Sequence, residues 1–403
     1  MRFNLWEDCN RVPLTELLSF IVDNRGKTVP TAPSGHKLIA TNCVTNNTLF
    51  PVYEKIRYLS EETYQTWFRA HPIPGDILFV NKGTPGRVCL VPDPVDFCIA
   101  QDMIALRADE SKIYPKYLFA VLRSREIQQQ IYNTNVGDVI PHFKKQFLNQ
   151  LLIPIPERSI QESIGDLYYV LSLKAERNKK INDNLYAQAR AIKRQWVAKS
   201  KDRYELLPLN EVAAINPDTY SPKEAWEYVN YLDTSSITNG FIADIQHIVP
   251  SSEKLPSRAR RKVAAGDVLF STVRPNQNHF GIISDPLPNM LASTGFAAIR
   301  SKNPLVCNEL IYLCLTELDF IEKMQQLAEQ STSTFPSIKP SDLGTCQIPC
   351  PKDESSDAFT NTLKSLFALI AANFCENSSL ATMREALLPK LMSGEIDVSA
   401  VQL

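Results

Sequence analysis

The chain of 403 residues carries an internal duplication, which constrains its fold more than any other feature of the sequence. Four pairs of short segments match in the same order, at an offset of 191 to 195 residues. The pairs are 13–17 with 208–212, 75–79 with 266–270, 140–144 with 335–339, and 152–156 with 347–351. One such match could arise by chance, but four collinear matches indicate a tandem repeat, so we expect two copies of one folding unit.

Composition agrees with a globular protein of more than one domain. Hydrophobic residues make up 44% of the chain and charged residues 22%, which excludes extended disorder, and a chain of this length divides into two or three domains. The longest apolar run, 366–372, is far shorter than the roughly 18–20 residues of a membrane span, and residues 1–8 lack an apolar export signal. Nine scattered cysteines indicate reduced thiols, so we expect a cytoplasmic protein.

Each copy begins with a part rich in turn residues, which we place at 1–156 and 203–352 as two domains. Short apolar runs separated by Pro, Gly, Asn and Asp indicate strands and turns with a helix or two. The pattern predicts strands at 77–80 and 268–271, each entered from a Gly-Asp turn, and helices at 117–132 and 310–328.

Each copy ends with a part, 157–202 and 353–403, in which apolar residues recur with a period near 3.5. That period is typical of long helices packed along their length. Asn178 and Asn377 occupy like places in the two stripes, where a buried polar pair would fix the register. The alternative is two unrelated amphipathic helices, each lying on its own domain. The stripe residues are Ile160, Ile164, Leu167, Leu171, Asn178, Ile181, Leu185, Ile192 and Trp196, then Phe359, Leu363, Leu366, Ile370, Asn377, Leu380, Leu387 and Leu391.

Motifs for catalysis are missing from the sequence. There is no phosphate-binding glycine loop of the P-loop or dinucleotide type, and the five histidines are isolated. Cys346 and Cys350 have no second pair nearby, so we interpret them as buried structural thiols and expect no metal site. The segment 216–220 (Asn-Pro-Asp-Thr-Tyr) only partly matches the adenine-holding loop of amino-methyltransferases, and a turn leading into the domain is the better interpretation. We therefore expect no catalysis by this chain alone.

Basic residues gather in loops. Because 43 Lys and Arg balance 44 Asp and Glu, any nucleic-acid surface must be local. The segment 271–279 after the second predicted strand contains Arg, Asn and Gln, the side chains that pair bidentately with guanine and adenine edges. The segment 81–87 occupies the same place in the first copy. Either loop alone would be ordinary solvated surface, but their recurrence favours a binding role. A third basic stretch, 157–201, has ten Lys or Arg against five acids, and a solvated helix face is as good an interpretation as phosphate contact.

Taken together, these features resemble the specificity (S) subunit of type I restriction–modification systems over essentially the whole chain. The motifs that carry the resemblance, besides the duplication, are 25–30 (Arg-Gly-Lys-Thr-x-Pro), 75–79 with 83–86, 266–271, 333–339 and the tail 387–396. The copies differ at two places: His142-Phe143 stands where the second copy has Ser337-Ile338, and Lys82-Gly83 stands where it has Arg274-Pro275. The resemblance therefore implies no particular DNA target.

The resemblance implies an α+β fold with two tandem mixed target-recognition domains, joined by two long helices packed as an antiparallel coiled coil with pseudo-two-fold symmetry. It implies a non-catalytic subunit whose domains each recognise one half of a bipartite site in double-stranded DNA. Two methyltransferase (modification) subunits would be its partners, with ATP-dependent restriction subunits in systems that cleave. S-adenosylmethionine would be bound by the methyltransferase subunits, and this chain would bind no cofactor. The alternatives are a stand-alone DNA methyltransferase or nuclease, and a protein-binding scaffold.

The residues expected to contact DNA are the basic and amide side chains of these loops. They are Arg25, Lys27, Lys82, Thr84, Arg87 and Lys144 in the first copy, and Arg258, Arg260, Arg261, Lys262, Thr272, Arg274, Asn276, Gln277 and Lys339 in the second.

Overall fold

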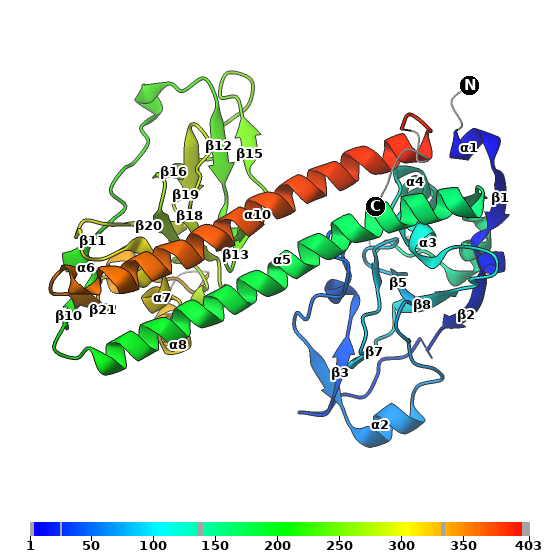
Figure 1. Cartoon of the computed structure of the whole chain (residues 1–403), viewed down its shortest axis with the longest axis horizontal. Helices are drawn as coiled ribbons and strands as arrows, with labels where there is room; N and C mark the ends of the chain where they lie inside the picture. The colour runs from blue at the N-terminus through cyan, green and yellow to red at the C-terminus, as the bar shows by residue number, and fades with distance from the viewer. Residues whose placement is uncertain (1–3, 25, 135–139, 332–334, 397–403) are drawn as a thin grey trace. The chain divides into compact units, whose positions relative to one another are not determined.

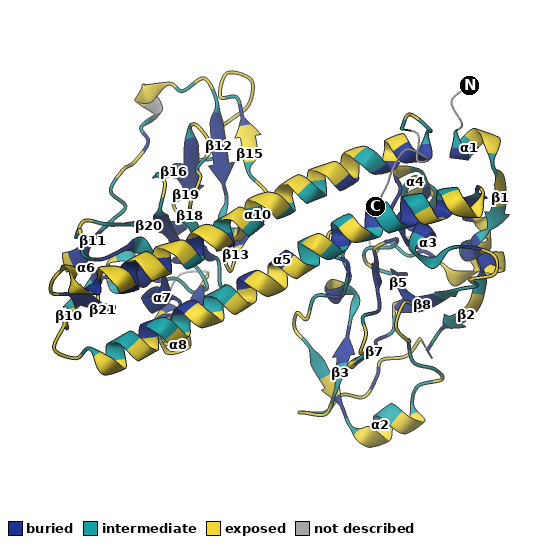
Figure 2. Cartoon of the chain, viewed as in Figure 1, coloured by how far each residue is buried: buried dark blue, intermediate teal, exposed yellow. Residues whose placement is uncertain are grey.

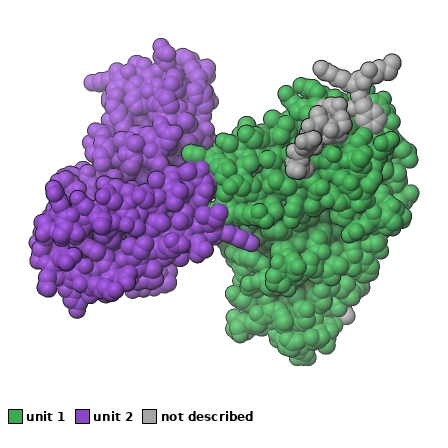
Figure 3. Space-filling view, in the orientation of Figure 1, with its two compact units in different colours: residues 1–179, 375–403 green, residues 180–374 purple. Residues whose placement is uncertain are grey.

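The computed structural model describes residues 4–24, 26–134, 140–331 and 335–396. The chain forms two compact units, one of residues 1–179 with 375–403 and the other of residues 180–374 (Figure 3). Each unit therefore takes a part of both long helices together with one mixed α/β part. The predicted four-part division at residues 156, 202 and 352 remains a prediction.

The first unit is built on a four-stranded sheet in the order β2-β8-β5-β6, with a three-stranded sheet β4-β3-β7 and a β1-β9 ribbon. Strand β5 lies inside the larger sheet and all four of its residues are buried, as its continuous apolar run requires. The strands are β1 (Asn10–Pro13), β2 (Leu18–Val22), β3 (His36–Ile39), β4 (Arg57–Leu59), β5 (Ile77–Val80), β6 (Val88–Leu90), β7 (Phe97–Ile99), β8 (Met103–Ala108) and β9 (Leu152–Ile155). The helices are α1 (Leu5–Asp8), α2 (Glu61–Thr66), α3 (Pro115–Leu122) and α4 (Arg125–Asn133), with short 3-10 turns η1 (Leu14–Leu17), η2 (Thr41–Cys43) and η3 (Lys145–Gln150).

The second unit repeats this plan. Its sheets have the orders β11-β20-β17-β18 and β15-β12-β19-β16, with a β10-β21 ribbon and a β13-β14 hairpin. The strands are β10 (Tyr204–Pro208), β11 (Ala213–Ile215), β12 (Val229–Leu232), β13 (Ile237–Thr238), β14 (Phe241–Ile242), β15 (Gln246–Ile248), β16 (Ala259–Lys262), β17 (Asp267–Ser271), β18 (Phe280–Ile283), β19 (Met290–Ser293), β20 (Phe296–Ser301) and β21 (Gln347–Pro351). The helices are α6 (Leu209–Val212), α7 (Asn308–Leu315), α8 (Leu318–Glu329) and α9 (Pro340–Leu343), with η4 (Pro222–Glu224), η5 (Thr234–Ser236), η6 (Pro275–Gln277) and η7 (Glu354–Ser356).

The Gly-Asp turns that precede β5 and β17 have the same structural role in both units. Gly75 and Gly266 adopt positive φ angles of 86° and 84°, which glycine tolerates without strain. The following carboxylate is almost completely buried, and it pairs with an arginine on the neighbouring strand. Asp76 accepts hydrogen bonds of 2.9 and 3.0 Å from Arg107, and Asp267 accepts bonds of 2.7 and 2.9 Å from Arg300. The motif therefore holds the central strands together at one end of each sheet.

Where single helices were predicted at 117–132 and 310–328, each unit has two helices. In the first unit the break lies between α3 and α4, because the Ser124 hydroxyl accepts a hydrogen bond from the Ile127 amide and caps α4. The Arg123 side chain at the break is buried and donates to three backbone carbonyl groups. In the second unit, Thr316 and Glu317 separate α7 from α8.

The two long helices are α5 (Arg158–Lys199) and α10 (Asp357–Met392), and they pack against each other within each unit (Figure 1). The pairing is antiparallel: the Trp196 ring stacks on Phe359 at 4.2 Å, and the Tyr168 ring lies 5.7 Å from the Arg384 guanidinium carbon. Figure 2 shows buried and half-buried positions on the facing sides of both helices and exposed positions on the outer sides. The alternative of two unrelated helices is wrong.

One predicted position in the stripe is also wrong. Ile181 is 47% exposed, and Asn182 takes the inward position with 3% exposure. The Asn182 side-chain amide donates to the Ile370 carbonyl at 3.2 Å and accepts from the Asn373 amide at 2.7 Å. A helix turns every 3.6 residues, so a stripe drifts relative to a 3.5-residue repeat, and here the drift places a polar residue inside.

Among the described residues, no helix combines the length and apolar character of a membrane span.

Candidate nucleic-acid interface

In each unit a loop follows an inner strand of one four-stranded sheet, β5 in the first unit and β17 in the second, and another segment of the same unit pairs with this loop. We call 81–87 and 271–279 the first and second recognition loops, and 140–144 and 335–339 the first and second support segments. Lys82 forms an isolated β-bridge with His142, and Val273 forms the equivalent bridge with Ser337. The sequence repeat thus corresponds to a structural repeat at the loops as well as in the sheets.

The backbone hydrogen bonds between loop and support segment are the same in the two units. The Gly83 amide donates to the Pro141 carbonyl and the Arg274 amide to the Pro336 carbonyl, both at 2.9 Å. Each support segment is anchored in the core by its fourth residue, since Phe143 is fully buried and Ile338 is 6% exposed. The backbone of each loop is therefore hydrogen-bonded to a segment that is anchored in the core.

The first recognition loop and its support segment together carry four predicted residues. Lys82 and Thr84 are half-buried, whereas Arg87 and Lys144 are exposed. Close packing of the loop on α4 requires Gly86, where an added Cβ would lie 3.0 Å from Gln128 and 3.1 Å from Ile131. The Gln128 side chain also donates to the Gly86 carbonyl at 2.9 Å, which fixes the turn that carries Arg87.

The second recognition loop has a left-handed backbone at Arg274, with a φ angle of 47°, followed by the 3-10 turn η6. The Arg274 guanidinium lies over the Phe335 ring, 5.1 Å from its centroid, a cation–π geometry that orients the guanidinium. Asn276 and Gln277 are exposed on η6. The exposed Lys339 lies in the adjacent support segment, so the loop and segment together present two cations and two amides.

Thr272 differs from the other predicted residues of this loop. Its side chain is 6% exposed, and its hydroxyl donates to the Gly295 carbonyl at 2.9 Å. The Thr272 amide also donates to that carbonyl, so this residue ties the loop to the β19–β20 turn. Thr272 therefore supports the loop from inside, and its role in DNA contact remains a prediction.

The basic cluster 258–262 is spread along β16, so its members have different surroundings. Arg258 is exposed and its carbonyl accepts from the Thr294 amide at 2.8 Å, beside the turn that holds Thr272. The Arg260 Nε donates to the Ser257 carbonyl at 3.2 Å. The Arg261 Nε is buried without a hydrogen-bond partner among the described residues, and burial lowers the pKa of this guanidinium.

At the far end of this strand, Lys262 is already paired. Its ammonium group lies 2.6 Å from Glu224 and 5.4 Å from the centre of the Trp226 ring, and the hydrogen bond from Lys262 lowers the pKa of Glu224. Of the predicted cluster, the structure therefore brings Arg258 closest to the second recognition loop.

One further predicted residue, Lys27, belongs to the loop after β2. Lys27 is exposed there, and Asp23 of the same loop forms an ion pair with Lys145, which directly follows the first support segment. Arg25 lies outside the described residues.

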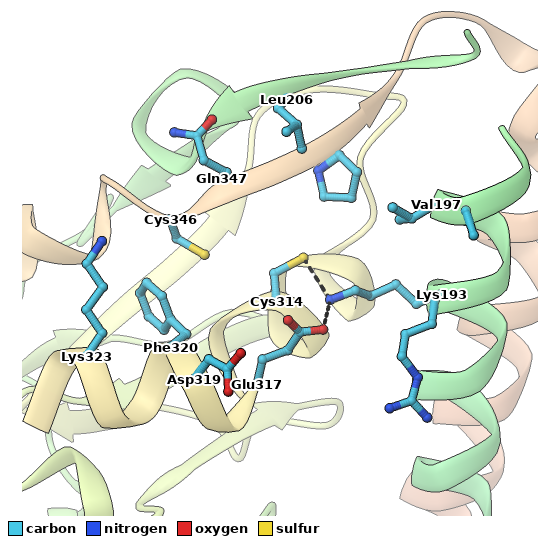
Figure 4. A pocket seen from close by; sticks show the side chains of 13 residues that line it. Lys193, Val197, Leu206, Cys314, Glu317, Asp319, Phe320, Lys323, Cys346 and Gln347 are labelled. Carbon is cyan, nitrogen blue, oxygen red and sulfur yellow. Dashed lines mark hydrogen bonds and ion pairs between the residues drawn. The ribbon is translucent and has the colours of Figure 1, made fainter. Parts of the chain in front are cut away.

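The third basic stretch contains residues that stabilise the second unit. Lys193 on α5 has a side chain only 8% exposed, and its ammonium lies 2.6 Å from Glu317 and 3.5 Å from the Cys314 sulfur (Figure 4). Burial raises the pKa of Cys314 although Lys193 opposes the shift. These residues line a cavity of about 500 Å³. Arg190 donates to the Thr316 carbonyl at 2.8 Å, so these two cations are part of the fold.

The burial predicted for Cys346 and Cys350 is confirmed. Cys346 and Cys350 are both buried, and burial raises the pKa of both thiols. The part of the chain that the structure describes contains no group of three or more His, Cys, Asp or Glu side chains placed to hold a metal ion.

Comparison with known proteins supports the family resemblance. Residues 24–187 match the family model described as "Type I restriction modification DNA specificity domain". The chain is 20% identical over 402 residues to the Type I restriction enzyme HindI specificity subunit of Haemophilus influenzae, covering 80% of this chain and 86% of that protein. It is 22% identical over 350 residues to the MjaIX specificity subunit of Methanocaldococcus jannaschii, covering 80% and 78%.

A solved structure supports the fold. The crystal structure of a type I restriction–modification S subunit from M. genitalium aligns with a TM-score of 0.56 and 17% identity, covering 97% of this chain and 98% of that one. The predicted fold class and the predicted resemblance are confirmed.

Proposed function

We infer that this chain, which carries a type I restriction–modification DNA specificity domain and matches specificity subunits over most of its length, is the DNA specificity subunit of such a system. Each unit binds one half of a bipartite site in double-stranded DNA through its recognition loop and support segment. The observation that carries this proposal is the equivalence of the two edges. Lys82 and Val273 form the same bridge on two copies of one sheet, and Gly83 and Arg274 donate the same backbone hydrogen bond, so the predicted match of Lys82 with Arg274 is wrong by one residue.

The chemistry of the edges suits DNA. The exposed cations Arg87, Lys144, Arg258 and Lys339 suit contact with backbone phosphates, which supplies affinity without sequence information. Arg274, Asn276 and Gln277 suit bidentate pairing with guanine or adenine edges in a major groove. Since a short loop has room for few such pairs, each edge specifies only a short half-site, and two half-sites together give the full specificity.

We propose that catalysis is supplied by partners. Two methyltransferase subunits, which bind S-adenosylmethionine, would methylate adenine at sites selected by this chain, and ATP-dependent restriction subunits would join them where the system cleaves. This chain would contribute recognition alone and would act in the cytoplasm, where its DNA substrate lies.

The long helices have a function in the same proposal. Helix α5 has 42 residues, about 63 Å at ~1.5 Å per residue, and α10 runs antiparallel to it. A stiff connection of fixed length converts two weak half-site contacts into one tight bipartite contact, because binding of one half raises the effective concentration of the other. It also limits the gap between the half-sites, since equivalent major-groove faces recur about every 10–10.5 base pairs.

The experiment that tests the proposal combines methylome sequencing with binding. Cells with and without this chain are compared, and the expected difference is one bipartite methylated motif with a fixed gap. The purified chain should bind a duplex with that motif more tightly than a scrambled duplex, and the affinity should fall steeply with salt. Methylation by the purified chain without partners would indicate a stand-alone methyltransferase. Salt-independent or absent DNA binding, with an unchanged methylome, would indicate a protein-binding scaffold.

A further inference from the structure

Each support segment begins with a large apolar residue that faces solvent. Ile140 is 54% exposed and Phe335 is 53% exposed, and they occupy equivalent positions in the repeat. Singly, exposed hydrophobic residues are normal on a protein surface and need no explanation. These two differ from that background because they recur at the same structural position, at the edge that also carries the recognition loop.

The backbone fixes where these side chains lie. Ile140 precedes Pro141, whose carbonyl accepts from the Gly83 amide, and Phe335 precedes Pro336, whose carbonyl accepts from the Arg274 amide. Each apolar residue is therefore adjacent in sequence to a residue that contacts the recognition loop. The ring of Phe335 also carries the Arg274 guanidinium at 5.1 Å. The Phe335 side chain is thus held next to a group that suits base edges, and Ile140 occupies the equivalent position in the first unit.

We propose that Ile140 and Phe335 are specificity-determining residues, each making an apolar contact with a thymine 5-methyl group in its own half-site. This inference rests on the proposed function and deepens it. The thymine methyl is the one apolar group that a base presents in the major groove, and it distinguishes an A·T pair from the other pairs. An exposed aromatic or branched side chain next to a recognition loop is suited to that group.

The test removes the methyl group and the side chain separately. Each thymine of the methylated motif is replaced, one at a time, by deoxyuridine, which lacks only the 5-methyl. For the wild-type chain with its methyltransferase subunits, one substitution in one half-site should weaken binding about fourfold, since burial of a methyl is worth roughly 0.8 kcal/mol and 1.4 kcal/mol is tenfold. Phe335→Ala should weaken binding to the thymine duplex by a similar factor and should abolish the effect of deoxyuridine at that position. Ile140→Ala should do the same in the other half-site.

Matched controls exist in both units. Leu287 is 46% exposed and lies in the connection between β18 and β19. This connection follows Ile283, which pairs with Asp267 at the start of β17, so it lies at the opposite end of the sheet from the second recognition loop. Ile73 is 45% exposed beside Asp76, at the opposite end of β5 from the first loop. Leu287→Ala and Ile73→Ala should leave both affinity and deoxyuridine sensitivity unchanged. Because these variants each remove one large, about half-exposed apolar side chain, they separate a local contact from a general effect.

A further variant separates direct contact from positioning of Arg274. Phe335→Leu keeps an apolar side chain but removes the ring under the guanidinium. It should retain deoxyuridine sensitivity, and if it behaves like Phe335→Ala, the ring acts through Arg274 and the proposal is wrong. Full deoxyuridine sensitivity in Phe335→Ala would also overturn it, as would equal weakening of motif and scrambled duplexes. Absence of any preference for the motif in the wild-type complex would instead contradict the proposed function itself.

Discussion

The side-chain amide of Asn178 on α5 donates a hydrogen bond to the Asn377 side-chain oxygen on α10, at a distance of 2.9 Å. The Asn377 amide in turn donates to the Ala175 carbonyl at 3.3 Å, so the pair crosses the helix interface in both directions. The Asn178 oxygen itself is buried without a hydrogen-bond partner among the described residues. A polar pair of this kind defines one register at some cost in stability.

The first prediction concerns this pair. Replacing both residues, Asn178→Leu with Asn377→Leu, should raise the free energy of unfolding by about 1 kcal/mol, because the unsatisfied buried oxygen is removed and apolar contact is added. Asn178→Ala alone should lower it by a similar amount, since Asn377 then loses its donor. Urea unfolding of the three proteins measures both effects. A double-leucine variant less stable than the wild type would show that the asparagines stabilise the interface.

The second prediction separates base contact from phosphate contact in the second unit. Arg274→Ala should change base preference at one position of one half-site, at a cost of about 1–3 kcal/mol. Arg258→Ala should weaken binding to all sequences alike and should reduce the dependence of affinity on salt, because phosphates carry no base identity. Duplexes randomised in one half-site at a time, measured at two salt concentrations, distinguish the two. Altered preference in both half-sites would contradict independent recognition by the two units.

The third prediction concerns the length of the helices. Deleting one heptad from each of α5 and α10 shortens the helix pair by about 10 Å and preserves the packing stripe. The methylated motif should keep both half-sites, while its gap shrinks by roughly three base pairs at ~3.4 Å per pair. Methylome sequencing of cells that express the variant gives the gap. A folded variant with the original gap would show that the helices do not set the spacing.

The fourth prediction concerns the ion pair between Arg300 and Asp267, at the Gly-Asp turn of the second unit. Arg300→Met should destabilise the chain by about 3–5 kcal/mol, because it leaves the fully buried Asp267 carboxylate without its partner. Lys262→Met, which breaks the more exposed pair with Glu224, should cost less than about 1 kcal/mol. Thermal unfolding of both variants tests the contrast. Similar losses for the two would show that the burial of Asp267 does not govern its dependence on Arg300.

The fifth prediction concerns pH. Burial lowers the pKa of His71, whose ring lies 4.4 Å from Tyr64 and 5.1 Å from Phe68, with His36 on the other face of Tyr64. The unfolded chain then binds the proton more readily than the folded chain. The contribution of His71 to the free energy of unfolding should therefore be fully present above pH 6.5 and should be lost as the pH falls below it. His71→Phe should flatten this slope. Urea unfolding between pH 5 and 7.5 measures it, and an unchanged slope in the variant would assign the effect to other groups.

Much of this architecture follows from the sequence alone, because it depends on periodicity and local chemistry. The repeat predicted two equivalent units, and a Gly-Asp turn before an apolar run was enough to locate β5 and β17. The position of Asn178 opposite Asn377 followed from the 3.5-residue period of two stripes. Each strand signal and each helix stripe depends on residues near one another in the chain, and the repeat shows that the same local patterns occur twice in the same order.

The tertiary structure decided which polar groups remain available. Thr272 and Lys193 belong to segments that are polar or basic in sequence. The Thr272 hydroxyl, however, donates to the Gly295 carbonyl, and the Lys193 ammonium donates to Glu317. Phe335 lies beneath Arg274 although 61 residues of sequence numbering separate them. Burial and pairing depend on partners that are distant in sequence, and these partners become neighbours only when the sheets and helices pack. For that physical reason, the sequence identifies the candidate loops, whereas the packed fold determines which of their side chains face a ligand.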